Sequence, residues 1–206
     1  MINEHKEYYG AIRVYKNVFR NHEKIIGIFN QCAVNSRVWF WKKSSTSFTV
    51  GKKIRTSHEI NLPTVGVDYS KLNPNSDEIR TIILSSDIQN RVRKYVDHYA
   101  KDFGIIIDSN EKNRLVRYEI GEFFTMHRDD HPLTQRTIST VLYLNDNYEG
   151  GEIAFPRLDN LVYKPKAGDI AIFPSNYIYE HSSEPMISGD KYSVVVMMDI
   201  NLLAHK

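Results

Sequence analysis

The chain has 206 residues, of which 41% are hydrophobic and 25% are charged, a composition typical of a single ordinary globular domain. Its longest apolar run, at 194–198, is far too short to cross a bilayer, and the N-terminal segment lacks the apolar core of a signal peptide. The lone cysteine, Cys32, excludes an internal disulfide and any multi-cysteine metal site. These features predict a cytoplasmic protein without a membrane partner.

The formal net charge of +2 hides an asymmetry along the chain. Residues 1–60 contain 11 Lys and Arg against 4 Asp and Glu, a net charge of +7, so the remaining residues carry −5. A basic N-terminal third predicts either an acidic partner, nucleic acid included, or simply a solvated basic face. Charge alone leaves both interpretations open.

The first elements in chain order are a strand and a helix. Residues 11–19 are predicted to form a strand that turns Ile12, Val14 and Tyr15 toward the interior. Asn21 is a suitable cap for a helix that begins at His22. Residues 37–50 are rich in aromatic and β-branched side chains, which predicts extended structure.

A second helix is predicted where Ser86 and Gln89 form a possible capping box. Apolar side chains recur after it at helical spacing, at Ile88, Val92, Tyr95, Val96 and Tyr99. Gly104 is expected to end this helix.

Beyond Gly104 the pattern changes to short apolar runs separated by turn residues. This alternation predicts antiparallel strands that form a sandwich or a jelly roll packed on the two N-terminal helices. Of the two we expect the jelly roll, a double-stranded β-helix. We therefore expect residues 1–104 to form a supporting region of helices and strands, and residues 105–206 to form the jelly-roll core.

The most informative chemistry lies around His127 and Asp129. Two residues apart on a strand, an imidazole and a carboxylate point to the same face and can hold one metal ion. Iron(II) in oxygenases takes two histidines and one carboxylate, which leaves coordination positions open. His181, at the end of a predicted strand, is the candidate second histidine.

Other interpretations of this segment remain open. His127 and His131 are four residues apart, the spacing of a zinc-binding pair on a helix, but Pro132 disfavours a helix there. Asp130 could replace Asp129, although one step along a strand turns it to the opposite face. His127 and Asp129 could also be no more than a hydrogen-bonded surface pair.

Short motifs follow one another in order through the second half of the chain. They are Tyr-x-x-Gly-x-x-Phe-x-x-His-x-Asp at 118–129, Arg136, Tyr-Leu-Asn at 143–145, Gly-Gly-Glu-x-x-Phe-Pro at 150–156, Pro-x-x-Gly-Asp at 165–169, and His181 ten residues before Lys191. In this order they resemble the catalytic core of the iron(II)- and 2-oxoglutarate-dependent oxygenases of the prolyl 4-hydroxylase type. Ile54-Arg55-Thr56-Ser57 also resembles an upstream motif of the prolyl hydroxylases.

The resemblance implies a set of cofactors and residue roles. Fe(II) would be bound by His127, Asp129 and His181, with 2-oxoglutarate and O₂ as co-substrates and ascorbate as a further reductant. Lys191 would bind the distal carboxylate of 2-oxoglutarate, because a buried carboxylate needs a buried cation. Tyr118 and Tyr143 would donate hydrogen bonds to the co-substrate.

Some residues have a structural and a functional interpretation. Arg136 is expected to contact the substrate, as its family counterpart does, or to form a surface salt bridge. Gly150 and Gly151 are expected to form a turn without chemistry of their own. Trp39 and Trp41, next to two lysines, are expected in the core or in a lid, with stacking on a ligand as the alternative.

Two departures from the family pattern stand near these residues. Glu184 and Pro185 follow His181-Ser182-Ser183, which places a carboxylate close to the expected metal, and the acid Asp129 is doubled by Asp130. Neither departure removes a ligand.

These observations predict a dioxygenase that hydroxylates a C–H bond, with succinate and CO₂ as co-products. The resemblance favours a peptidyl proline as substrate, in a peptide or protein. Oxidation of a free amino acid, a small molecule or nucleic acid is the alternative, and nucleic acid is disfavoured because nucleic-acid demethylases of this superfamily use arginine where Lys191 stands. A jelly-roll binding module without catalysis is the other alternative.

Overall fold

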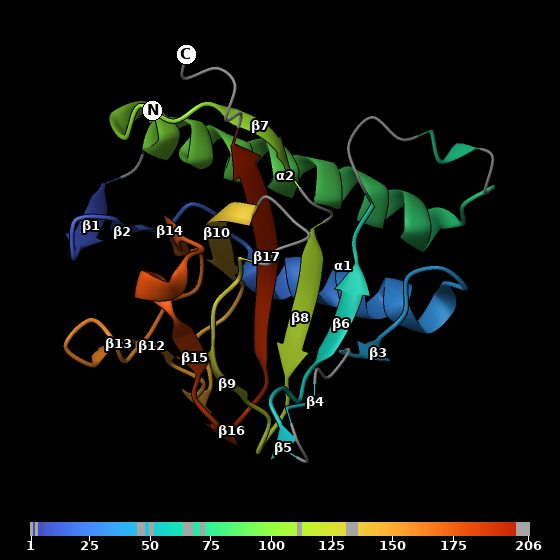
Figure 1. The fold of residues 1–206 in the computed structure, drawn as a ribbon. Helices are drawn as coiled ribbons and strands as arrows, with labels where there is room; N and C mark the ends of the chain where they lie inside the picture. Colours follow the sequence, from blue (N-terminus) through green and yellow to red (C-terminus); the bar gives the residue numbers. More distant parts are fainter. Residues whose placement is uncertain are drawn as a thin grey trace.

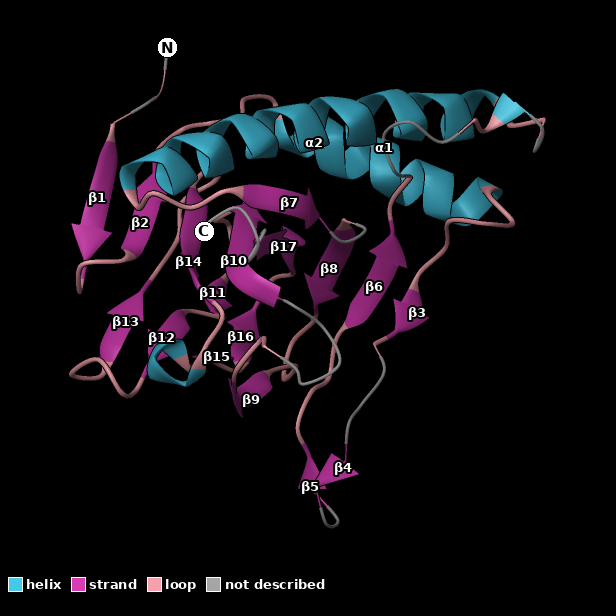
Figure 2. Cartoon of the chain, turned by 45° about the horizontal axis from the view of Figure 1, so that its top comes forward, coloured by secondary structure: helices cyan, strands magenta, loops and turns pink. Residues whose placement is uncertain are grey.

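The computed structural model describes residues 2, 4–44, 48–49, 52–63, 68–70, 73–110, 113–130 and 136–200. In it, two helices lie side by side against one face of a large antiparallel sheet, and a smaller sheet faces the other side (Figures 1 and 2). The helices are α1 (His22–Asn35) and α2 (Ser76–Asp102). The predicted class, mainly β with two flanking helices, is confirmed.

The larger sheet contains strands from both ends of the chain. Its order is β1 (His5–Tyr8), β2 (Ile12–Tyr15), β14 (Ile170–Pro174), β10 (Arg136–Tyr143), β17 (Lys191–Ile200), β8 (Arg114–Tyr118), β6 (His58–Asn61) and β3 (Lys42–Lys43). β7 (Ile107–Asn110) pairs with the C-terminal end of β17. All of these pairings are antiparallel, as a jelly roll requires.

The smaller sheet has the order β13 (Leu161–Tyr163), β12 (Ile153–Phe155), β15 (His181–Ser183) and β9 (Phe124–His127). Two short pairs complete the fold: β11 (Glu149–Gly150) with β16 (Met186–Ser188), and β4 (Phe48–Thr49) with β5 (Lys52–Lys53). A short 3₁₀ turn, η2 (Tyr177–Tyr179), connects β14 to β15. The two facing sheets form the double-stranded β-helix.

Alternation along the central strands separates a structural face from a functional one. On β14, Ile170 and Ile172 pack in the core beneath the helices, whereas Ala171 and Phe173 face the smaller sheet. On β17, Val194, Val196 and Met198 belong to the same helix-side core. The intervening residues of β17 line a cavity between the sheets: Lys191, Ser193, Val195 and Met197. One strand therefore supports the core and the site together.

α1 begins at His22, as predicted, but Asn21 does not cap it with its side chain. Instead Asn21 adopts the left-handed conformation, with φ of 60°, which asparagine tolerates better than most residues. The buried residues of α1 are Ile25, Phe29 and Cys32, and Ile26 is partly buried against the same core. The lone cysteine is a core residue.

The N-terminal cap of α2 lies eleven residues earlier than predicted, and the Ser86–Gln89 capping box is wrong. The cap is Asn75, whose side chain accepts hydrogen bonds from the backbone of Asp77 and Glu78, while Glu78 accepts one from the backbone of Asn75. Gly104, with φ of 64°, follows the end of the helix as predicted.

Segments before Gly104 supply strands to the same sheet as the rest of the chain. β2 lies within the predicted strand, with Ile12, Val14 and Tyr15 all buried. Within 37–50 the structure describes the short strands β3 and β4, and residues 45–47 and 50 lie outside the described residues. β6 pairs with β8 and extends the sheet toward β3. The division at residue 104 stays a prediction.

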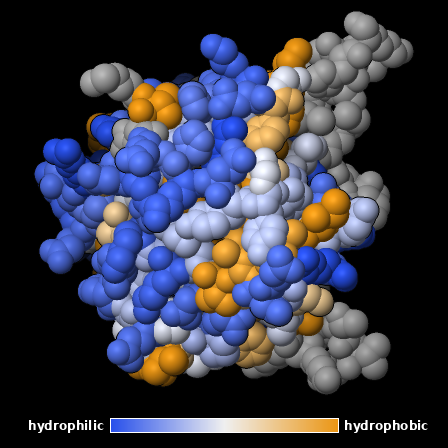
Figure 3. All heavy atoms as spheres, turned by 90° about the vertical axis from the view of Figure 1, so that its left-hand side faces the viewer, coloured by the Kyte–Doolittle hydropathy of each residue, from blue (hydrophilic) through white to orange (hydrophobic). Residues whose placement is uncertain are grey.

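The surface is mostly polar on the side of β1, β2 and β13, with scattered apolar patches (Figure 3). No helix among the described residues is long and apolar enough to span a membrane. Several basic residues of the N-terminal third form internal ion pairs: Arg13 with Glu7 and Asp102, Lys16 with Asp169, and Arg55 with Glu59. Part of the excess positive charge is thus neutralised inside the fold.

Candidate metal and co-substrate site

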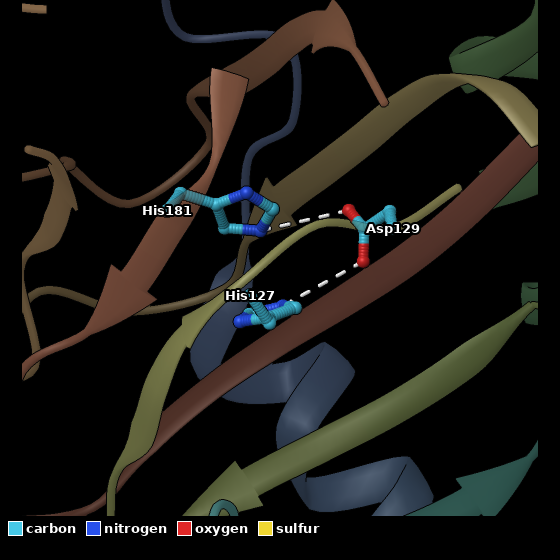
Figure 4. Close-up of side chains that lie close together, drawn as sticks. All are labelled: His127, Asp129 and His181. Atoms are coloured by element: carbon cyan, nitrogen blue, oxygen red, sulfur yellow. Dashed lines mark ion pairs between the residues drawn. The ribbon is translucent and has the colours of Figure 1, made fainter. Parts of the chain in front are cut away.

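His127, Asp129 and His181 meet at one point between the two sheets (Figure 4). His127 ends β9 and His181 begins β15, and the two are register partners in the antiparallel pair. Asp129 lies just beyond the end of β9, so it reaches the site from a turn and not from the strand itself. One ligand atom from each residue lies within 4.8 Å of the others.

Both imidazole rings are oriented by backbone carbonyls. Nδ1 of His127 lies 2.9 Å from the Thr125 carbonyl oxygen, and Nδ1 of His181 lies 3.1 Å from that of Tyr179. A carbonyl can only accept, so each Nδ1 carries the proton and each Nε2 keeps a free lone pair. The Nε2 atoms lie 3.6 and 3.5 Å from the two Asp129 oxygens. This donor set fits a divalent metal.

The protonation states also suit metal binding. Burial is the main cause that lowers the pKa of His181 to about 4, so its imidazole is neutral at neutral pH. Burial by itself would raise the pKa of Asp129, but interactions with His181, His127 and Ser139 outweigh it and hold the pKa well below its usual range. Asp129 is therefore ionised, and no proton has to be displaced from His181 or Asp129 when a metal binds.

Two serines that sequence reasoning missed hold Asp129 in place. Ser139 on β10 donates a hydrogen bond to Asp129 Oδ2 at 2.6 Å, and its hydroxyl lies 2.8 Å from that of Ser175. The Ser175 carbonyl accepts from the backbone N–H groups of Asp129 and Asp130, which anchors the turn itself. Ser139 is ten residues from Asp129, so only the strand pairing reveals the contact.

We expect Ser139→Ala to weaken metal binding by about tenfold, because the carboxylate loses the donor that orients it. Titration of the anaerobic protein with Mn(II) or Fe(II) measures this directly. Ser188→Ala, on β16 outside the cavity lining, is the matched control and should bind metal like the wild type. Unchanged affinity in Ser139→Ala would show that the turn alone positions Asp129.

Lys191 lies in the wall of the same cavity, which has a volume of about 290 Å³. Only 3% of its surface is exposed. Its ammonium group donates hydrogen bonds to the Gly151 carbonyl, at 2.7 Å, and to the Ser183 hydroxyl, and lies 4.5 Å from the centre of the Tyr118 ring. Within the described part of the chain it forms no ion pair, so this cation fits an incoming carboxylate.

The other predicted co-substrate residues surround Lys191. Tyr118 and Tyr143 are both buried and both line the cavity. Burial raises the pKa of each phenol, so both hydroxyls stay protonated and able to donate. Gly151 lies so close to Met186 and Lys191 that a Cβ there would clash, and its carbonyl contacts Lys191. The Gly-Gly turn therefore also shapes the lysine pocket.

The residues that the sequence offered as alternatives or departures near the metal have other partners or lie outside the described part of the chain. Asp130 forms an ion pair with Arg128 at 3.0 Å and is not among the clustered ligands. Glu184 accepts a hydrogen bond from Ser182 at 2.7 Å and lies outside the cavity lining. His131 and Pro132 lie outside the described residues.

Trp39 and Trp41 both pack in or against the helix-side core. Trp39 is buried, and the Trp41 indole donates a hydrogen bond to Asn30 at 3.2 Å. The core interpretation therefore holds for both residues, and neither lines the cavity.

Four arginines also line the cavity: Arg55, Arg114, Arg128 and Arg136. Arg136 was predicted, and its guanidinium donates to the Asp129 carbonyl at 3.4 Å. Arg55 was noticed only as part of a motif, and Arg114 was missed, because a single arginine at the start of a strand carries no signal in the sequence.

The structure is a double-stranded β-helix that has two histidines and one carboxylate between its sheets and a buried lysine beside them. This arrangement is typical of metal-dependent oxygenases, whose iron site keeps coordination positions open for co-substrates. Residues 114–198 match the profile of the 2OG-Fe(II) oxygenase superfamily. In fold, site and this match the chain is similar to that superfamily, and within it the chain resembles the prolyl 4-hydroxylases; the predicted resemblance is confirmed.

Individual relatives and solved structures agree with this resemblance. Prolyl 4-hydroxylase 13 of Arabidopsis thaliana is 28% identical over 153 residues, 61% of this chain and 53% of that protein. A viral collagen prolyl hydroxylase from Paramecium Bursaria Chlorella virus-1, solved as a 2OG complex, superposes with a TM-score of 0.63 at 19% identity over 91% of this chain and 95% of its own. A Trichoplax adhaerens prolyl hydroxylase, in complex with a hypoxia inducible factor peptide fragment, gives a TM-score of 0.66 at 15% identity, over 93% and 84%.

The chain spans about half the length of the curated relatives it matches first. The structural neighbours, all below 25% identity, establish the fold.

Proposed function

We propose that the chain is an Fe(II)- and 2-oxoglutarate-dependent dioxygenase that hydroxylates a C–H bond of a peptidyl proline, with succinate and CO₂ as co-products. The observation that carries this proposal is the single cavity that contains both the His127–Asp129–His181 cluster and the buried Lys191. The prolyl hydroxylases among the relatives support the choice of proline.

In this proposal the protein supplies position, protonation state and exclusion of water. His127, Asp129 and His181 would hold Fe(II), which with 2-oxoglutarate activates O₂ for C–H oxidation. Lys191 would bind the distal carboxylate of 2-oxoglutarate, with hydrogen bonds from Tyr118 and Tyr143. Arg136, next to Asp129 in the cavity wall, would contact the substrate. We include ascorbate as a reductant for assays, and a cytoplasmic location on the ground of the buried free thiol of Cys32.

The test is turnover of proline-containing peptides with Fe(II), 2-oxoglutarate and ascorbate in air. We expect a peptide mass increase of one oxygen atom and one succinate per modified peptide, both abolished in Asp129→Ala. Free L-proline in a parallel assay separates a peptidyl substrate from a free amino acid. Protein that binds metal and 2-oxoglutarate yet oxidises none of these compounds would contradict proline as the substrate.

A further inference from the structure

The cavity is electropositive well away from Lys191. On β8, Arg114, Val116 and Tyr118 project to the same face and all line the cavity. Tyr118 pairs with Lys191 of β17, and Arg114 pairs with Val195, four residues further along. At about 3.3 Å per residue, Arg114 and Lys191 stand roughly 13 Å apart along the strands. The backbone positions of Arg114 and Lys191 therefore lie well apart along the cavity wall.

Three of the four cavity arginines, Arg55, Arg114 and Arg136, form what we call the arginine cluster, while Arg128 pairs with Asp130. Arg55 is already paired: it donates to Ser57 at 2.9 Å and forms an ion pair with Glu59 at 3.4 Å. Arg136 donates to the Asp129 carbonyl. Arg114 differs, because among the described residues its guanidinium has no hydrogen-bond or ion-pair partner, although it is partly buried.

The surroundings of Arg114 disfavour its charge. Burial is the largest cause that lowers the pKa of Arg114, and the positive charges of Arg55 and Arg136 lower it further. Glu59 and Asp129 act in the opposite direction, but Glu59 already pairs with Arg55 and Asp129 belongs to the metal-ligand cluster. Arginine nevertheless stays protonated in proteins, so the cluster holds more positive than negative charge. A charged, partly desolvated guanidinium that faces a cavity and has no partner among the described residues is suited to an anionic ligand.

The co-substrate is an unsuitable partner for this cluster under the function proposed above. Lys191 already offers a buried cation for the distal carboxylate, and Asp129 balances charge at the metal. Since Lys191 and Asp129 already account for the distal carboxylate and the metal, the arginine cluster faces the part of the cavity that is left for the substrate.

We propose that Arg114, with Arg55 and Arg136 beside it, binds a carboxylate of the substrate, so that this enzyme selects proline substrates that carry a nearby negative charge. The inference rests on the proposed function and adds the charge class of its substrate. The carboxylate has two possible sources, an acidic side chain within two residues of the target proline or the α-carboxylate of the free amino acid. A planar guanidinium pairs with either through two parallel hydrogen bonds.

Binding measurements without turnover provide the test. Anaerobic protein is loaded with Mn(II) and 2-oxoglutarate and titrated at low salt with fluorescent proline peptides that differ only in Glu, Gln or Lys at one flanking position. L-proline and L-prolinamide are compared in competition. In one of the two comparisons, the Glu peptide against the Gln peptide or L-proline against L-prolinamide, we expect the ligand with the carboxylate to bind about tenfold more tightly than the ligand with the amide. Added salt should reduce this preference.

Variants assign the preference to Arg114. Arg114→Gln should bring the Glu-to-Gln ratio, or the proline-to-prolinamide ratio, close to one, and Arg114→Glu should favour the Lys peptide. Arg93→Gln removes the same charge from a solvent-accessible position on α2, away from the cavity lining, and should keep the wild-type preference. Arg114→Gln should melt no lower than the wild type, since it removes repulsion, and should bind 2-oxoglutarate normally.

The outcomes separate this inference from the proposed function. If the wild type does not bind Mn(II) or 2-oxoglutarate, the proposed function itself is contradicted. Normal loading without a carboxylate preference, or a preference that survives in Arg114→Gln, would overturn the role of the arginine cluster alone. That role is equally overturned if loaded protein binds none of the acidic ligands.

Discussion

His181→Ala should abolish the visible metal-to-ligand charge-transfer band that Fe(II) and 2-oxoglutarate give with the anaerobic wild-type protein. The substitution removes one of three ligands, and the remaining His127 and Asp129 cannot hold the metal in the same geometry. Turnover should fall below detection with it. The fold should survive, because His181 contributes to the smaller sheet through its backbone, while its ring adds contacts with Phe155, Phe173 and His127 and one hydrogen bond to the Tyr179 carbonyl.

The control is His98→Ala, a histidine of α2 that bonds to Tyr15 and lies away from the cavity. It should keep both the band and the activity. Asp129→Asn serves as a second variant in case His181→Ala is unstable, because it keeps the size of the side chain. A band of wild-type intensity in folded His181→Ala would refute the proposed ligand set.

The sequence could predict the ligands because they belong to a motif and a spacing that chemistry restricts. It could not predict how they meet. His181 begins β15 after the turn η2, and its position opposite His127 depends on a pairing between strands more than fifty residues apart. Ser139 and Arg114 are invisible for the same reason, since their roles depend only on which strands face the cavity.

The early start of α2 was missed because its first turns invert the usual pattern. Ile79 and Ile83 are 46% and 65% exposed, whereas Thr81 and Ser85 are buried. A search for an apolar stripe therefore fails there, and helical periodicity becomes clear only from Ile88 onward. The local signal was the Asn75-x-x-Glu78 capping pattern, which does not depend on burial.

The strands of the first hundred residues were harder to predict for a different reason. β3 has only two residues and β6 only four, and three of the four β6 residues are polar. Such strands are stabilised by joining an existing sheet edge, here at β8, and not by their own propensity. Their existence depends on the sheet formed by the rest of the chain.

Lys191→Met should have two opposite effects, a loss of 2-oxoglutarate binding and a gain in the stability of the ligand-free protein. The first follows because the distal carboxylate would be buried without a cation, which should weaken binding by about 100-fold or more. The second follows because burial lowers the pKa of Lys191 from 10.5 to about 7 in the ligand-free fold. A methionine of similar length avoids that cost.

The stability of the wild type should depend on pH with a defined sign. Between pH 7 and 10.5 the folded protein has released the Lys191 proton while the unfolded chain still holds it, so the wild type gains stability as the pH rises through this window. Below pH 7 the full cost applies, on the order of a few kcal/mol, since each tenfold change in the proton equilibrium is about 1.4 kcal/mol. Lys191→Met should therefore melt several degrees higher at pH 6, and the difference should shrink toward pH 10.

The co-substrate reverses the balance, because the bound carboxylate favours the ammonium form. Above about pH 7 each 2-oxoglutarate must bind together with one proton, so its apparent affinity should fall by up to about tenfold per pH unit in the wild type. Melting curves and 2-oxoglutarate titrations from pH 6 to 10 measure both effects, with the exposed Lys101→Met as control. A Lys191→Met protein less stable than the wild type at pH 6 would mean that the hydrogen bonds to Gly151 and Ser183 outweigh burial, and that the lysine stabilises the fold in addition to binding the ligand.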